Sequence, residues 1–347
     1  GQTQLDNLDL GSARSIEVLR GPASALYGNA SGGVIHIRTE DGGEEPFVES
    51  RMSGGSYGFH KYQLKTGGRI KALDYHLNGS WSSIDGYRRH SGAEQQFGGG
   101  KLRYHLTESS DLTTVFNHAH SPWAQDAGGL TRAEVDTNRR QARALNVTLD
   151  AGEEVSQGRL GFIYRNALTP DHEIVFTQNS LYRTFANKLP ILPAVGDGIV
   201  EFDRVGLGGG IKYVGRWEGN GRPNQLVAGV DAEFQEDDRQ RYANLGGSRG
   251  ALGFAQRESV RSVGPFIRNE FRATGRLSLI AGARYDNLRF EADDRFLTDG
   301  NDSGARTLDQ GSYSGGIVFT ARTNLQFYAN VSTAFQTPTT TELANPT

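Results

Sequence analysis

The sequence predicts an all-β fold, a transmembrane antiparallel β-barrel, and three observations support this prediction. Apolar and polar side chains alternate with a period of two in about thirteen segments from residue 46 onward. Short polar turns alternate with long connections along the chain, as is typical of outer-membrane barrels. No run approaches about 18 apolar residues, so membrane-spanning helices are not expected.

The composition fits a chain of strands and turns. Its 347 residues include 46 glycines but only 10 prolines and no cysteine. The lack of cysteine excludes disulfide scaffolds, thiol nucleophiles, zinc ribbons and iron–sulfur clusters. A formal net charge of −3 lacks the basic excess of a nucleic-acid binder, so no nucleic-acid partner is expected.

The alternation is clearest in the segments 72–81, 225–236, 276–290 and 325–335. Successive side chains of a strand point to opposite faces of the sheet. Each segment is therefore expected to present an apolar face to lipid and a polar face to the interior of a barrel. A soluble all-β protein, for example a carbohydrate-binding one, is the alternative in which the apolar faces meet in a core.

The long connections should all lie at one end of the sheet. The expected long loops are 82–96, 120–157, 184–203, 237–258 and 291–310. Every second connection is long, which a soluble sandwich or propeller does not require.

The first 45 residues have a different pattern. Two short strands are expected at 15–19 and 34–38, separated by a segment rich in glycine. The sequence 41–46 resembles a hinge into the first long strand. We therefore expect two domains, residues 1–45 and 46–347.

The segment between the two short strands carries a family resemblance. Ile16–Pro22 (I-E-V-L-R-G-P), followed by Leu26–Asn29 and Gly32–Ile35, resembles the end of the plug domain of TonB-dependent outer-membrane receptors. The match covers more than twenty residues in order and is specific.

Two later segments extend this resemblance along the chain. Gly282–Asp286 resembles the G-x-R-Y-D strand of the family's barrel, and Ser332–Thr339 with Glu342 and Leu343 resembles its S-x-x-F-x-x-P-x-x-x-E-L segment. The general likeness is greatest to the ferric-siderophore and ferric-dicitrate branch.

The resemblance implies a barrel of 22 strands filled by an N-terminal plug, of which this chain would supply about 13 strands and the C-terminal part of the plug. The chain is then expected to be an internal piece of a longer receptor in the outer membrane of a Gram-negative bacterium. The implied partners are the TonB–ExbB–ExbD complex, outer-membrane lipid and lipopolysaccharide, and a small-molecule metal chelate. Iron would be cargo only, so no resident cofactor is expected.

In the family, an arginine at the position of Arg20 pairs with carboxylates of the barrel wall. Alternation directs four acids toward the interior as possible partners, namely Asp231, Glu233, Glu270 and Asp286. A buried guanidinium needs such partners because an unpaired buried charge is costly. A solvated turn arginine is the alternative.

The long loops supply candidate ligand contacts. Arginine is a planar donor suited to carboxylates, and aromatic rings stack on flat ligands, so an anionic ferric chelate fits these residue types. The candidates are Tyr87, Arg88, Arg89, His90, Trp123, Arg132, Arg139, Arg140, Arg239, Arg241 and Tyr242. Solvated loop residues or contacts to lipopolysaccharide phosphate are the alternatives.

Other functions have weaker support. No P-loop, G-x-S-x-G elbow or H-E-x-x-H motif occurs and no histidine pair has zinc-site spacing, so neither an enzyme nor a metal site is expected. A passive porin or a surface adhesin remains as a barrel without energy coupling. Cobalamin and haem remain as other cargoes, although Phe335–Pro338 departs from the F-R-A-P motif of haem receptors.

Overall fold

The computed structural model describes residues 9–21, 23–219 and 221–338. Pro22 of the first motif and residues 339–347, with Glu342 and Leu343, lie outside the described residues.

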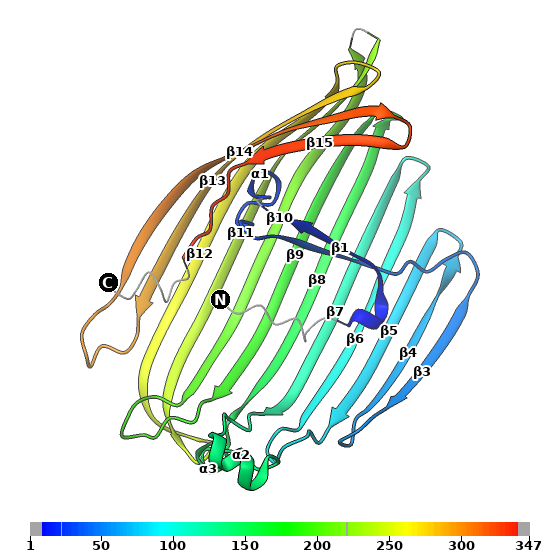
Figure 1. Cartoon of the computed structure of the whole chain (residues 1–347). Helices are drawn as coiled ribbons and strands as arrows, with labels where there is room; N and C mark the ends of the chain where they lie inside the picture. Colours follow the sequence, from blue (N-terminus) through cyan, green and yellow to red (C-terminus); the bar gives the residue numbers. More distant parts are fainter. Residues whose placement is uncertain (1–8, 22, 220, 339–347) are drawn as a thin grey trace.

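One antiparallel sheet of thirteen strands makes up most of the molecule, and its strands follow each other in sequence order (Figure 1). The strands are β3 (Phe47–Gly54), β4 (His60–Ile70), β5 (Leu73–Ile84), β6 (Ala93–Thr107), β7 (Ser110–Gln125), β8 (Gly152–Thr169), β9 (His172–Lys188), β10 (Ile199–Gly219), β11 (Arg222–Leu245), β12 (Ser248–Arg272), β13 (Leu277–Asp294), β14 (Gly304–Arg322) and β15 (Leu325–Ser332). The all-β prediction with thirteen barrel strands is confirmed.

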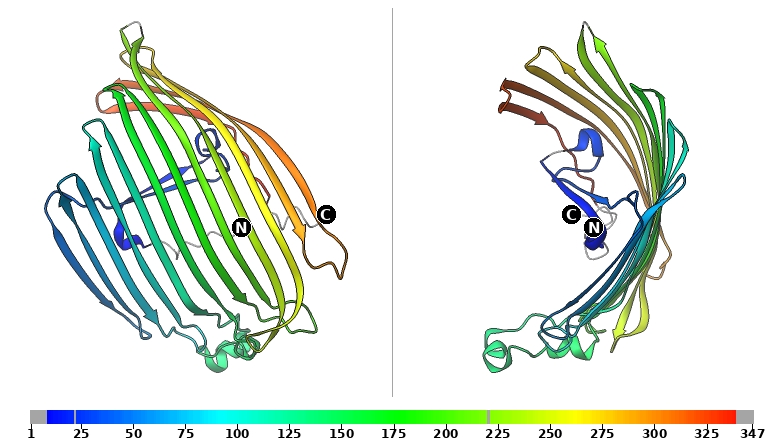
Figure 2. Two further views of the ribbon diagram at one scale, coloured as in Figure 1. Left: turned by 180° about the vertical axis from the view of Figure 1, so that it is seen from behind. Right: turned by 90° about the vertical axis from the view of Figure 1, so that its right-hand side faces the viewer.

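The sheet is strongly curved, with a concave and a convex face (Figure 2). On β13, the convex side chains Leu279 and Tyr285 are 40 % and 51 % exposed, whereas Arg284 and Asp286 on the concave face are buried. More large apolar side chains are exposed than buried among the described residues. The apolar rows therefore form an outer surface rather than the core of a soluble sandwich.

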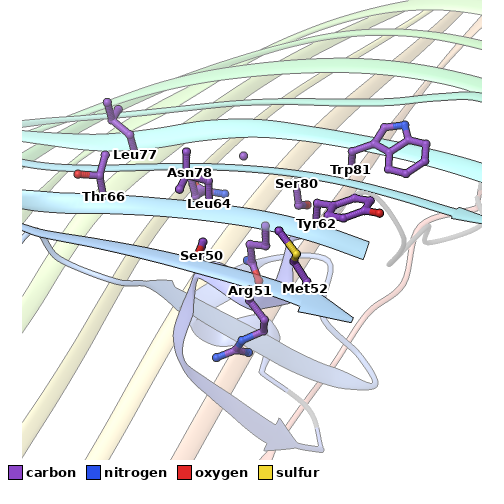
Figure 3. A pocket seen from close by; sticks show the side chains of 12 residues that line it. Ser50, Arg51, Met52, Tyr62, Leu64, Thr66, Leu77, Asn78, Ser80 and Trp81 are labelled. Carbon is purple, nitrogen blue, oxygen red and sulfur yellow. The ribbon is translucent and has the colours of Figure 1, made fainter. Parts of the chain in front are cut away.

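A pocket at the edge of this outer surface belongs to the same apolar rows. It is lined from β3, β4 and β5, and Met52, Tyr62, Leu64 and Trp81 are among its apolar members (Figure 3). The rings of Tyr62 and Trp81 stack at a centroid distance of 5.8 Å. Because these side chains continue the convex apolar surface, we do not assign a ligand to this pocket.

The two ends of the sheet differ, as expected. At the turn end, connections are short, for example the two residues between β4 and β5. At the loop end lie the connections 55–59, 85–92, 126–151, 189–198 and 295–303.

The prediction of a long loop at 237–258 is wrong. β11 and β12 continue through it and meet at Gly246 and Gly247, whose φ angles of +64° and +90° suit glycine. Backbone pairing continues here although the apolar–polar alternation ends, because both faces of a strand are polar where it extends beyond lipid.

The connection between β7 and β8 holds two helices, which the sequence analysis did not expect. They are α2 (Arg132–Asn138) and α3 (Ala144–Thr148). Thr131 and Glu134 form a reciprocal capping box at the start of α2. The T-x-x-E spacing was the signal that could have revealed this helix.

A second, two-stranded sheet crosses the concave face (Figures 1 and 2). β1 (Ala13–Arg20) and β2 (Gly33–Thr39) pair in antiparallel register, and the short helix α1 (Ser24–Tyr27) lies between them. A 3₁₀ turn, η2 (Leu10–Ser12), precedes β1. We call residues 13–39 the crossing hairpin.

Within the described part of the chain, no helix has the length and apolarity needed to cross a membrane.

Candidate ligand-binding and hairpin-docking site

The tip of the crossing hairpin docks on β12, β13 and β14 through α1. Ser24 and Ala25 of α1 are buried. Next to α1, Gly28 has a φ of +66°, and a Cβ built on it would lie 3.4 Å from the Arg284 guanidinium. The G-x-R-Y-D strand therefore holds a buried arginine directly against the hairpin tip.

Arg284 is neutralised by two carboxylates of the wall. Its Nη1 lies 2.8 Å from Oδ2 of Asp231, and its Nε lies 2.8 Å from Oδ1 of Asp286. A Cβ on Gly264 would fall 2.1 Å from the guanidinium, so only glycine leaves room for Arg284 here. A cation paired twice in this way tolerates burial, whereas a single unpaired charge would not.

The chain after β15 also holds the tip. Asn29 exchanges hydrogen bonds with Thr337, at 2.8 Å to its hydroxyl and 3.2 Å from its amide. The Ser31 hydroxyl donates to Gln336 at 3.1 Å. Two of the segments that carried the family resemblance thus contact each other.

The base of the crossing hairpin is held by charge. Glu40 lies 3.0 Å from the Lys65 ammonium and 3.2 Å from His76, which is only 1 % exposed. Asp41 forms an ion pair with Lys101. Asp9, before β1, forms one with Lys61 at 3.6 Å. At this end, residues that flank the hairpin supply the acids. Strands β4 to β6 supply most of the cations, and Arg14 of β1 also pairs with Asp41 at 2.8 Å.

The structure does not bring Arg20 to the four acids proposed for it. Its side chain at the end of β1 is exposed, and among the described residues it forms no ion pair. Arg284 takes Asp231 and Asp286 instead, and Glu270 pairs with Arg268 on its own strand at 3.3 Å. Glu233 belongs to the concave row of β11 but has no ion pair within the described part. The expected contact failed because two wall acids already have a partner within the wall.

Arg88 is a structural residue rather than an available ligand contact. Its guanidinium donates to the carbonyls of Gln141, Gly128 and Ala127 at 2.9, 2.5 and 3.0 Å. All three acceptors belong to the connection between β7 and β8. The side chain therefore joins the 85–92 loop to the 126–151 connection.

Its neighbours support the same junction. Arg140 donates from Nε to the Tyr87 carbonyl at 3.2 Å and lies over the Tyr87 ring, 5.8 Å from its centroid. A ring nitrogen of His90 lies 2.8 Å from the carbonyl oxygen of Ala151. The Arg89 backbone amide donates to the Arg140 carbonyl, and this bond does not use the exposed Arg89 side chain.

The other loop candidates are more exposed. Arg132 is exposed and pairs with Asp136 at 3.1 Å within α2. Arg139 follows α2 and is exposed. Trp123 lies on β7 rather than in a loop, is 38 % exposed, and packs against Gly92.

Arg239, Arg241 and Tyr242 lie on β11, not in a loop. Arg239 and Arg241 share the concave row with Asp231, because strand positions two apart face the same way. Tyr242 alternates with Arg241, and its hydroxyl donates at 2.6 Å to Gln240, a residue of the convex row. Sequence reasoning therefore placed these three residues in one loop, and the strand separates them to two faces.

Sequence reasoning missed a group of concave residues on β9, β10 and β12. Phe185 and Phe202 are directly opposed on neighbouring strands, with ring centroids 5.0 Å apart. Arg183 lies over both rings at 5.4 and 5.6 Å, and Arg204 lies over Phe202 at 5.0 Å. With the residues of β11 and β12 beside them, they form what we call the arginine–phenylalanine platform: Arg183, Phe185, Phe202, Arg204, Arg239, Arg241 and Phe254. The R-T-F and F-D-R spacings of two were the available signal.

Strand register places the platform between the hairpin tip and the loop end. Gly210 of β10 is level with Asp231, the partner of Arg284 beneath the tip. Arg204 lies six positions nearer the loop end on the same strand, about 20 Å along it. A ligand entering from the loop end would therefore meet the platform before the hairpin.

No group of three or more His, Cys, Asp or Glu that could hold a metal ion occurs among the described residues. The platform instead offers cations and ring faces, which suit an anionic and flat molecule.

Comparisons with known proteins agree with this architecture. The rhizobactin receptor of Rhizobium meliloti strain 1021 is 25 % identical over 402 aligned positions, which cover 96 % of this chain and 52 % of that protein. The crystal structure of the ferric citrate transporter FecA superposes with a TM-score of 0.82 at 17 % identity, covering 95 % of this chain and 51 % of that one. The alcaligin outer-membrane receptor FauA of Bordetella pertussis gives a TM-score of 0.76 at 14 % identity, with 95 % and 51 % covered. The chain thus spans about half the length of these relatives.

Two family models match separate parts of the chain. The TonB-dependent receptor plug domain matches residues 1–34, and the TonB-dependent receptor-like β-barrel matches residues 48–347. With its curved thirteen-strand sheet and a hairpin docked across the concave face, this chain belongs to the TonB-dependent receptor family.

Proposed function

We propose that the complete protein takes up a scarce ferric chelate, a ferric siderophore or a ferric citrate-like complex, with energy from the TonB–ExbB–ExbD complex. The observation that carries this proposal is the crossing hairpin, which is docked to the wall at both its base and its tip. A passive pore has no use for an obstruction fixed at two ends. A ligand-gated importer needs one that stays in place until it is pulled.

The other parts of the site support the same function. The platform faces the path of an entering ligand, and its arginines suit an anionic complex. Relatives of similar fold are a rhizobactin receptor and a ferric citrate transporter. We further propose that the plug part comprises residues 1–45 and the barrel part 46–347.

Two kinds of surface contact belong to this proposal. The convex apolar rows would contact outer-membrane lipid, and arginines near the loop end would meet lipopolysaccharide. Among the loop candidates, exposed Arg132 and Arg139 are the ones we propose as first contacts for the chelate.

The test is uptake by cells. A strain that lacks its own iron receptors would express the full-length protein, and accumulation of ⁵⁵Fe supplied as a siderophore or as citrate would be followed with TonB present or deleted. We expect accumulation only when both the receptor and TonB are present. Equal accumulation without TonB would indicate a passive porin, and no accumulation of any ferric chelate would reject iron as the cargo.

A further inference from the structure

Two phenylalanines lie at the centre of the platform. Phe185 and Phe202 are half-buried and lie on the concave face. Their rings are inclined by 27° to each other at 5.0 Å, so they form one continuous apolar surface. The two rings position the guanidiniums of Arg183 and Arg204, and a ligand that carries aromatic rings can also pack on them, which a simple carboxylate cannot do.

The cations of the platform are not all neutralised. Arg204 binds Asp237 through two nitrogens at 2.6 and 2.7 Å, and Arg239 binds Glu258 at 2.9 Å. Arg241 forms no ion pair with any described residue. The platform therefore carries the positive charge of Arg241, which the neighbouring acids Asp237 and Glu258 do not neutralise through an ion pair.

Arg241 is also held in a defined position. Its guanidinium lies 4.7 Å from the centroid of the Phe254 ring. Its Nε is buried and has no hydrogen-bond partner in the described part of the chain. Stacking on a ring fixes the plane of a guanidinium and leaves its outer N–H groups to a planar oxygen anion.

Together these features select among ferric chelates. A complex whose ligating oxygens are phenolates or carboxylates on aromatic rings is negatively charged and presents flat ring faces. Ferric citrate is anionic but has no ring, and a ferric trihydroxamate has neither a net negative charge nor a ring. We propose that the platform binds the aryl-bearing, anionic class of ferric chelate, with Arg241 contacting the anion and Phe185 and Phe202 lying against the ligand rings. This inference rests on the proposed function and narrows its cargo.

The experiment measures binding to the purified full-length receptor in detergent. The probes are ferric tris(2,3-dihydroxybenzoate), ferric citrate and ferrioxamine B, and binding is read by calorimetry. We expect the aryl complex to bind about tenfold more tightly than ferric citrate, since one good ring contact accounts for roughly this ratio.

Variants separate the ring contact from the charge. Phe202→Leu should weaken the aryl complex about tenfold and leave ferric citrate unchanged, whereas Arg241→Gln should weaken both anionic complexes. Arg241→Lys should restore part of the citrate affinity but not that of the aryl complex, because an ammonium does not stack as a planar guanidinium does. Arg276→Gln, at an exposed site in the turn between β12 and β13, is the matched control and should leave the aryl complex unchanged.

Failure of this inference is distinct from failure of the proposed function. Ferric citrate or ferrioxamine bound as tightly as the aryl complex, or a Phe202→Leu effect equal on all three probes, would overturn the aryl assignment and leave iron uptake standing. No binding of any of the three complexes by a folded receptor would overturn both. Folding of each variant is checked by its resistance to heat in detergent.

Discussion

Arg88 and Arg89 are adjacent and chemically identical, yet the structure gives them different tasks. The Arg88 guanidinium donates to three backbone carbonyls of the 126–151 connection. Arg89 contacts the same connection through its backbone amide, which donates to the Arg140 carbonyl. The pattern Y-R-R-H identifies neither task, because the acceptors lie about 40 to 53 positions away in sequence.

This difference gives a matched pair of variants. Arg88→Gln should loosen the 126–151 connection by about 2 kcal/mol, because charge-assisted hydrogen bonds to several carbonyls are lost. Trypsin should then cleave faster at the exposed Arg132 and Arg139. Arg89→Gln is the control and should leave the cleavage rate unchanged; equal acceleration in both variants would contradict the role of Arg88.

Asn244 has a similar role at the loop end. It is completely buried, donates to the carbonyls of Leu149 and Leu189 at 2.9 and 3.1 Å, and accepts from Gly247 at 2.7 Å. One side chain thus joins three connections. Candidate ligand contacts on these connections are therefore positioned by residues that do not face the ligand.

At the scale of elements, α2 depends on its first turn. The Thr131 amide and hydroxyl both donate to the Glu134 carboxylate, which lowers the pKa of Glu134 below its usual value. A lowered pKa in the folded state means that the stabilisation is complete above the unfolded value of about 4.3 and is lost as the pH falls through the folded pKa.

The expected result is a helix that frays in acid. Amide hydrogen exchange in residues 132–138 should speed up as the pH drops below about 4, after correction for the intrinsic pH dependence of exchange. Thr131→Val should weaken α2 by about 1 kcal/mol at neutral pH, and Glu134→Gln, which removes the titrating carboxylate, should remove this pH dependence. An unchanged pH profile in Glu134→Gln would show that the capping box does not hold the helix.

At the scale of the whole molecule, the crossing hairpin is attached to the sheet at two ends by different kinds of interaction. The base relies on ion pairs of Asp9, Glu40 and Asp41, and the tip relies on packing of α1 and on hydrogen bonds to residues 336 and 337. The TonB-dependent receptor family to which the chain belongs comprises non-enzymatic transporters of the Gram-negative outer membrane. In the uptake that we propose, the attachments at the two ends of the crossing hairpin are the contacts that a pulling force must overcome.

Removing a charge at the base of the hairpin should loosen the base and leave the tip unchanged. Glu40→Gln, measured in the full-length receptor, should speed amide exchange at Glu40, whose amide donates to Ser12, by about fivefold. The control is Glu45→Gln, because Glu45 is exposed and forms no ion pair within the described residues.

Salt should act on the same end. Raising the ionic strength from 0.1 to 1 M shortens the Debye length from about 10 to 3 Å and should loosen the partly exposed ion pairs of the base, with little effect on residues 24–28 of the tip. Lowering the pH should also loosen the base: partial burial raises the pKa of Asp41, but Lys101 and Arg14 outweigh it and hold that pKa below its usual value. If added salt or a lower pH loosened the tip as much as the base, the two ends would not be held by different interactions.

The sequence alone determined the sheet. A strand that faces lipid on one side and a polar interior on the other must alternate with a period of two, so each strand between residues 46 and 335 could be located from its own residues. The segment around Gly28 and the G-x-R-Y-D strand indicated a plug and a barrel only through their family resemblance, and the structure shows that the two contact each other. The helix α2 was also readable in principle, from its capping box.

Only the tertiary structure decided which charges meet and how far the strands extend. Arg284 rather than Arg20 holds Asp231 and Asp286, and wall lysines hold the acids that flank the hairpin. Asp231 and Glu40 lie 53 and 25 positions from their partners, so neither pair could be recognised from neighbouring residues. The loop-end halves of β11 and β12 were hidden because water on both faces removes the alternation while the backbone hydrogen bonds continue. The platform escaped notice for the same reason: its phenylalanines and arginines come from four strands, and only the curvature and register of the sheet bring them together.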